Sequence, residues 1–258
     1  MSLVVSWIAA HSSAASLYFA ADSRISWQDG SRWDHAQKVF SSPQTNEVFA
    51  YAGDVIFPTQ TLGQLCQIAH TGVLFGHAAA AEDRAKIYFN ILQSAFASYP
   101  QHCLAERFDV LYAHCSNGQF ALFRIEYTSE NQTSLSREDI PEKSGPIRVL
   151  GSGRKLFNNQ YEREPRTSWG VFHAFGKVLD AEIDKKVGGV PQVVSLYSNG
   201  QTNLYGLSYY GSKGLLGLDA SAATCPVAVN WRNENFERWD PRTGTLIAKT
   251  QRQPRLDV

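Results

Sequence analysis

Apolar residues along the chain fall into two spacings, one typical of strands and the other of helices. Short runs rich in β-branched and aromatic residues, bounded by polar turn residues, predict strands that pair as antiparallel hairpins. The predicted strands cover residues 2–10, 16–22, 38–41, 47–52, 108–114, 120–127, 147–150, 193–197 and 202–209. The polar stretch 128–145 is expected to be a long surface loop.

Helical spacing occurs in three segments. The first follows Gly53, with Pro58 suited to an opening helical turn, and the others span about 79–98 and about 167–184. Strands are grouped before and after the helices instead of alternating with them. This order favours an α+β protein in which two antiparallel sheets are flanked by helices.

Composition excludes several classes of function. The 258 residues include 24 Lys and Arg against 24 Asp and Glu, so the formal net charge is zero. No basic excess is present to bind nucleic acid or a membrane surface. Four scattered cysteines and seven histidines without H-x-x-x-H spacing predict no metal site, and we expect no cofactor.

The N-terminal apolar run is read as a strand. The first basic side chain is Arg24, so the positive region that opens a signal peptide is missing, and we expect a cytoplasmic protein. No repeat or low-complexity linker divides the chain. We therefore predict one domain over residues 1–210 and a C-terminal extension, 211–258, that packs on the domain or on a neighbouring subunit.

Five short motifs occur in an informative order. They are Ala20-Ala21-Asp22-Ser23-Arg24, Lys38, Ala52-Gly53, Gly151-Ser152-Gly153 and the segment from Asp184 to Gly189 (DKKVGG). Over residues 2–210 this arrangement resembles the proteasome β-subunit family and its HslV-like relatives, which are N-terminal-nucleophile (Ntn) hydrolases. The resemblance implies a four-layer αββα sandwich of two antiparallel sheets flanked by helices.

By this resemblance, Ser2 is the nucleophile once Met1 is removed. Its hydroxyl attacks, and its α-amino group, with a pKa of about 7.7–8.0, acts as the base. Lys38 would place a cation beside the hydroxyl, and Asp22 would hold that ammonium. The alternatives are that Lys38 is an exposed strand lysine and that Asp22 caps the end of its strand.

Three further residues have roles implied by the same family. Gly53 would offer its backbone N–H to the oxyanion, or serve only as a tight turn. Ser152 and Asp184 would orient the terminal amine, or lie in a solvated loop and helix end. The sequence departs from the family pattern in having serine as the nucleophile and Val187 in place of a serine.

The substrate pocket is implied by resemblance alone. Its lining would be Ile25, Ala36, Tyr51 and Val55, an apolar set suited to a medium-sized hydrophobic side chain. The alternative is that these four residues are ordinary core.

The sequence thus predicts a proteasome-type endopeptidase that cleaves peptide (amide) bonds in peptide or protein substrates, without nucleic-acid or membrane partners. The resemblance also implies a homo-oligomeric ring or stacked assembly. Two alternatives stay open. One is a catalytically silent scaffold or assembly subunit that retains Met1, and the other is an amidase or acylase acting on small molecules with the same fold.

Overall fold

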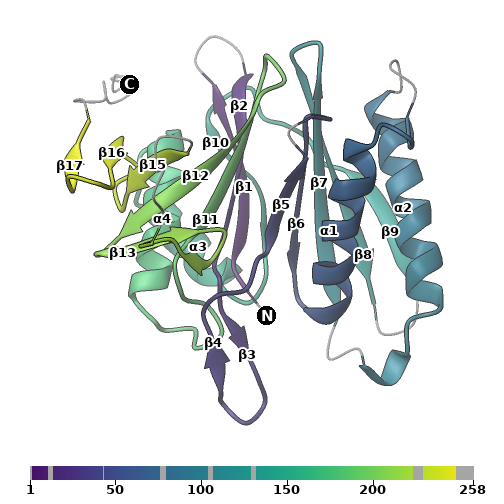
Figure 1. Ribbon diagram of the computed structural model, residues 1–258, viewed down its shortest axis with the longest axis horizontal. Helices are drawn as coiled ribbons and strands as arrows, with labels where there is room; N and C mark the ends of the chain where they lie inside the picture. The colour runs from purple at the N-terminus through teal and green to yellow at the C-terminus, as the bar shows by residue number, and fades with distance from the viewer. Residues whose placement is uncertain are drawn as a thin grey trace.

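The structure is a computed structural model that describes residues 2–10, 14–42, 44–75, 80–103, 107–128, 132–222 and 229–247. Two β-sheets face each other, with helices on both outer sides (Figure 1). The prediction of an α+β protein with antiparallel sheets is confirmed, and the described residues include four α-helices. Residues 11–13, between the first two predicted strands, and the chain beyond residue 247 lie outside the described residues.

The larger sheet holds the N-terminal strand one place in from its edge. In spatial order it contains β10 (Gly145–Leu150), β1 (Val4–Ala10), β2 (Ala14–Ala21), β11 (Gln192–Tyr197), β12 (Thr202–Tyr209), β13 (Ser212–Leu215) and β14 (Leu218–Asp219). Neighbouring strands in this path are antiparallel. A further strand, β15 (Asn230–Asn233), pairs with β12 in parallel and is the exception to the antiparallel pattern.

The second sheet is a five-stranded antiparallel meander. It contains β5 (Val39–Ser42), β6 (Glu47–Ala52), β7 (Phe108–Ser116), β8 (Gln119–Tyr127) and β9 (Thr133–Arg137). Two short hairpins stand apart from both sheets, β3 (Ile25–Ser26) with β4 (Arg32–Trp33) and β16 (Trp239–Asp240) with β17 (Thr245–Leu246). The β3–β4 hairpin projects from the end of the molecule at which the chain begins (Figure 1).

Each sheet carries its own pair of helices. α1 (Ile56–His70) and α2 (Ala81–Ala97) cover the five-stranded sheet, and α3 (Arg154–Tyr161) and α4 (Ser168–Asp180) cover the larger one (Figure 1). A short 3₁₀ turn, η1, spans Gln101–Cys103. None of the helices within the described ranges is long and apolar enough to cross a membrane.

Three apolar clusters fill the spaces between the layers. One lies between the two sheets, and one lies beneath each helix pair. In β1, Val4 and Ile8 join the inter-sheet cluster, whereas Val5 and Trp7 join the cluster under α3 and α4. Because side chains alternate along a strand, burial on both faces explains why β1 is a continuous apolar run.

The structure corrects the sequence analysis in three places. Residues 128–145 are not all loop, because β9 forms there as an exposed edge strand of which only Leu135 packs on the core. Helix α3 was not predicted, because it buries only Phe157 and Tyr161 and two apolar positions do not make a recognisable helical pattern. The third predicted helix stops at Asp180 instead of about 184, and Glu182 then takes a positive φ of 47°.

Candidate active site

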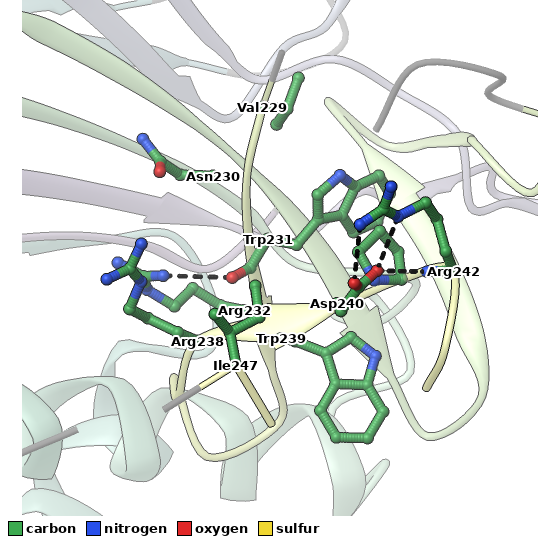
Figure 2. Close-up of a pocket in the computed structure, with 10 residues that line it drawn as sticks. Val229, Asn230, Trp231, Arg232, Arg238, Trp239, Asp240, Arg242 and Ile247 are labelled. Atoms are coloured by element: carbon green, nitrogen blue, oxygen red, sulfur yellow. Dashed lines mark hydrogen bonds and ion pairs between the residues drawn. The ribbon is translucent and has the colours of Figure 1, made fainter. Parts of the chain in front are cut away.

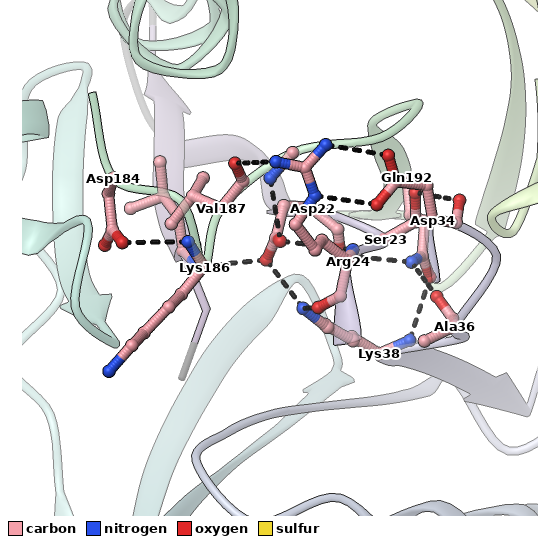
Figure 3. A network of polar contacts seen from close by, with 12 residues as sticks. Asp22, Ser23, Arg24, Asp34, Ala36, Lys38, Asp184, Lys186, Val187 and Gln192 are labelled. Carbon is pink, nitrogen blue, oxygen red and sulfur yellow. Dashed lines mark hydrogen bonds and ion pairs between the residues drawn. The ribbon is translucent and has the colours of Figure 1, made fainter. Parts of the chain in front are cut away.

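The buried carboxylate of Asp22, just past the end of β2, organises the candidate site (Figure 3). Its Oδ1 accepts hydrogen bonds from the Leu3 amide at 2.9 Å and the Lys38 ammonium at 2.8 Å. Its Oδ2 accepts from the amides of Arg24 and Gly188, both at 3.2 Å. Four donors from four separate positions thus converge on one fully buried side chain.

Lys38 is as deeply buried as its partner. Its side chain is 0% exposed, and its Nζ also donates to the Arg24 carbonyl at 2.6 Å. The alternative of an exposed strand lysine is therefore excluded. Burial lowers the pKa of Lys38, and the adjacent Asp22 carboxylate offsets part of that effect.

Ser2 lies two residues before β1 and is held by backbone contacts. It is 1% exposed, and its carbonyl accepts from the Gly153 amide at 3.3 Å. Gly151 approaches so closely that a Cβ there would lie 1.9 Å from the Ser2 carbonyl oxygen, and its φ is +89°. Only glycine fits that position without displacing Ser2. Met1 lies outside the described residues.

Ser152 and Asp184 lie next to these contacts. Ser152 is exposed and lies two residues before α3, between the two glycines that contact the Ser2 backbone. Asp184 is half-buried; its Oδ1 accepts from the Lys186 amide at 3.0 Å and its carbonyl from Val187, also at 3.0 Å. These two hydrogen bonds of Asp184 stay within its own turn.

Gly53 and Val187 both fill tightly packed positions. Gly53 has a φ of +115°, and a Cβ would come within 2.3 Å of the Arg107 carbonyl, so the turn between β6 and α1 requires glycine. The Val187 side chain is buried with Leu3, and its Cγ2 would lie 3.2 Å from a Cβ at Gly153. Valine therefore supplies apolar packing where the resemblance has a serine hydroxyl.

The predicted pocket residues differ in depth. Ala36 and Tyr51 are buried, whereas Ile25 and Val55 are half-buried. The Tyr51 hydroxyl has no hydrogen-bond partner among the described residues. Burial raises the pKa of this phenol, and the charges of Asp22 and Asp54 raise it further.

Sequence reasoning missed the ion pair that closes the base of the β3–β4 hairpin. The Arg24 guanidinium donates to Asp34 Oδ1 at 2.7 Å and Oδ2 at 2.8 Å, and also to the Val187 carbonyl at 3.3 Å. This pairing holds the pKa of Asp34 below its usual range. Arg24 was visible in its motif, but nothing in the sequence marked Asp34 as its partner.

Sequence reasoning also missed Gln192, the first residue of β11. It is 0% exposed, and its side chain bonds to the backbone around both Asp22 and Lys38 (Figure 3). The only sequence signal is an amide side chain at the start of an otherwise apolar strand.

A separate hollow of about 180 Å³ lies in the C-terminal region (Figure 2). Trp231, Trp239 and Arg238 are among its lining residues, and Arg242 is paired with Asp240 at 3.0 Å. None of these residues belongs to the Asp22 network. Over the ranges that the structure covers, no group of three or more His, Cys, Asp or Glu side chains is placed to hold a metal ion.

Comparison with known proteins places the fold. No family model and no curated protein matches the chain. Among solved structures, the chain is similar to the Anbu (Gly-1) mutant from Hyphomicrobium sp. strain MC1, with a TM-score of 0.52 and 15% sequence identity. The match covers 78% of this chain and 82% of the Anbu chain.

This match corrects the resemblance drawn from the motifs. Assignment to the proteasome β-subunit and HslV-like family is wrong at that level, because the chain matches the solved structure of Anbu, a proteasome-related Ntn hydrolase. The finding supports a proteasome-like fold in the broad sense. At 15% identity it establishes a shared fold, and the chemistry must be argued from this chain's own residues.

Proposed function

We propose that this protein is an Ntn hydrolase of the proteasome-like fold that cleaves peptide (amide) bonds with Ser2 as the nucleophile. The observation that carries the proposal is the sharing of Asp22 Oδ1 between the Leu3 amide and the Lys38 ammonium. This shared oxygen ties the residue that follows Ser2 to a buried cation. The layered αββα arrangement is, in this proposal, the Ntn-hydrolase sandwich.

The chemistry requires a free α-amino group on Ser2, formed when the peptide bond before Ser2 is cut. The Ser2 hydroxyl then attacks the scissile carbonyl carbon while its proton passes to the α-amino group. The C–N bond breaks, the departing amine takes that proton, and an ester on Ser2 remains. Water hydrolyses the ester by the same proton route in reverse.

The other site residues assist in defined ways. The Lys38 ammonium favours the ionised form of the Ser2 hydroxyl, and Asp22 fixes the ammonium. The Gly53 N–H, at the turn into α1, is proposed to stabilise the oxyanion, and Ser152 with Asp184 to orient the amine.

The substrate proposed is a peptide or protein with a medium-sized hydrophobic side chain before the cut. Ile25, Ala36, Tyr51 and Val55 are proposed as the lining of its pocket, an apolar set without a charged residue. A homo-oligomeric assembly, in which access to the site is controlled by neighbouring copies, is part of the same proposal.

The second candidate is a catalytically silent scaffold subunit with Met1 retained. Two observations favour it: Ser2 is only 1% exposed, and Val187 is an apolar residue beside the segment that would orient the amine.

One experiment separates the two candidates. The intact mass of the protein is measured before and after incubation with a peptide epoxyketone, which reacts with a hydroxyl and its adjacent free amine. The hydrolase should begin at Ser2 and gain one inhibitor mass. Ser2→Ala should gain nothing, whereas Ser6→Ala, at a buried serine of the strand that follows Ser2, should label like the parent protein.

A mass that keeps the preceding methionine and gains no inhibitor would favour the scaffold. Equal labelling of Ser2→Ala and the parent protein would contradict Ser2 as the nucleophile.

A further inference from the structure

The Gln192 side chain makes four hydrogen bonds to backbone groups on two other segments. Its Nε2 donates to the carbonyls of Asp22 at 3.2 Å and Ala36 at 2.6 Å. Its Oε1 accepts from the amides of Lys38 at 2.9 Å and Val39 at 3.4 Å. One amide group therefore links the backbone that carries the carboxylate to the backbone that carries the ammonium (Figure 3).

We propose that Gln192 is a positioning residue that fixes the Asp22–Lys38 pair across the gap between the two sheets. The inference rests on the proposed function, because the pair matters for turnover only if Ser2 reacts. All four of these hydrogen bonds go to backbone atoms, so Gln192 acts through the backbone of both partners.

Topology explains why such a link is needed. Asp22 follows β2 in the larger sheet, and Gln192 pairs with Ala21 in that same sheet. Lys38, in contrast, leads into β5 of the second sheet. Strand pairing therefore fixes Asp22 relative to Gln192, whereas the Lys38 carbonyl is bonded to the Tyr51 amide of the second sheet. Between the two segments the backbone supplies a hydrogen bond from the Ala36 amide to the Ser23 carbonyl at 2.9 Å, and the Gln192 side chain adds four more.

The backbone groups around position 192 require a side chain that ends in an amide. The two carbonyls need donors and the two amides need an acceptor, all in a fully buried place. Only Asn and Gln offer an N–H₂ and a carbonyl together, and Asn is one methylene shorter. Leaving these four backbone groups without partners would destabilise the buried segment.

The test compares Gln192→Met, which keeps length and removes all four hydrogen bonds, with Ser195→Ala on the same strand. Ser195 is also buried, but it contacts the Tyr205 hydroxyl, away from Asp22. Backbone amide exchange is followed by mass spectrometry over residues 36–40, and peptide hydrolysis is followed against pH.

We expect Gln192→Met to exchange its Lys38 amide at least about ten times faster than the parent protein. Its kcat should fall by up to about 10²-fold with KM nearly unchanged, as misplacement of reacting groups predicts. Asp22, Asp34 and Arg24 are the charged groups that act on Lys38. A looser Asp22 contact should therefore move the alkaline limit of activity to lower pH, and Ser195→Ala should change none of these quantities.

Gln192→Glu provides a second variant if Gln192→Met fails to fold. When protonated, its carboxyl offers both a donor and an acceptor, and when ionised it repels the two carbonyls. If Gln192 positions the pair, Gln192→Glu should keep its activity at low pH. It should lose that activity at a lower pH than the parent protein does as the pH is raised.

Unchanged exchange at Lys38 in Gln192→Met, or an unchanged kcat and pH profile, would overturn the proposal. If the parent protein neither hydrolyses peptides nor labels at Ser2, the proposed function has failed. In that case, faster amide exchange in Gln192→Met, confined to residues 36–40, would still support the link that Gln192 makes between the Asp22 and Lys38 segments. Unchanged exchange there would overturn that link as well.

Discussion

At the scale of single residues, burial of the Asp22–Lys38 ion pair means that neither residue can be replaced alone without leaving an uncompensated charge. Asp22 and Lys38 are both 0% exposed, so each charge depends on the other for compensation. The motif spacing allowed both residues to be predicted as members of one site. The Leu3 and Gly188 amides that donate to Asp22 are distant from it in sequence, and no local sequence pattern predicts such donors.

The pair makes a stability prediction distinct from the catalytic one. Lys38→Met should abolish hydrolysis. It should also lower the free energy of unfolding by about 3–5 kcal/mol, because it leaves the buried Asp22 carboxylate without its compensating charge. The double variant Asp22→Asn/Lys38→Met removes both charges and should be more stable than Lys38→Met alone. Urea unfolding of the two variants measures the difference.

A double variant no more stable than Lys38→Met would show that the uncompensated charge is not the source of the loss. Residual turnover in Lys38→Met close to that of the parent protein would contradict the role given to Lys38.

At the scale of elements, periodicity succeeded where one face carries several large apolar side chains. Helix α2 buries Ala85, Tyr88, Leu92 and Phe96 on one stripe, and the sequence predicted it to within two residues at its N-terminal end. Strand β9 has no fully buried residue, and Leu135 packs on the core only in part, so its sequence resembles a loop. Such an element forms because a neighbouring strand offers hydrogen bonds, and that information is tertiary.

The burial of His114 in β7 should make the free energy of unfolding depend on pH. His114 lies opposite Glu47 of β6, and burial lowers its pKa, with Arg84 acting in the same direction and Glu47 against it. As pH falls below about 6.5, the unfolded chain binds a proton that the folded chain resists. Stability should therefore fall on acidification, by at most about 1.4 kcal/mol per pH unit for this group.

Urea unfolding between pH 7 and pH 5 tests this dependence. His114→Gln should show a shallower decline than the parent protein, whereas His70→Gln, at an exposed position ending α1, should follow it closely. Identical slopes for all three proteins would contradict the assignment.

At the scale of the whole molecule, the C-terminal region is bound to the larger sheet by more than one contact. β13 extends the sheet beside β12, and β15 pairs with β12 in parallel. The Trp231 ring lies against Gly206, where a Cβ would come within 2.6 Å of it. The sequence marked the tryptophans of this region but could not indicate a parallel pairing, which depends on a crossover and has no local signature.

Trp231→Ala measures how far this region contributes to cooperative stability. Trp231 is 5% exposed, so its removal should lower the free energy of unfolding by about 3–5 kcal/mol in urea. Leu246→Ala, on an exposed side chain of the same region, should change it by less than about 0.5 kcal/mol. A loss as small for Trp231→Ala would mean that this region unfolds independently of the two sheets.

The Arg24–Asp34 ion pair has a consequence for how the molecule tolerates change. It fastens both ends of the β3–β4 hairpin next to Asp22, while the tip at Gly30 has no neighbouring atom within 4 Å of an added Cβ. Insertions at that tip lengthen a loop whose ends stay fixed, and the added entropy grows only slowly with length. The hairpin tip is thus a natural place to graft an epitope or a fluorophore without disturbing the buried pair behind it.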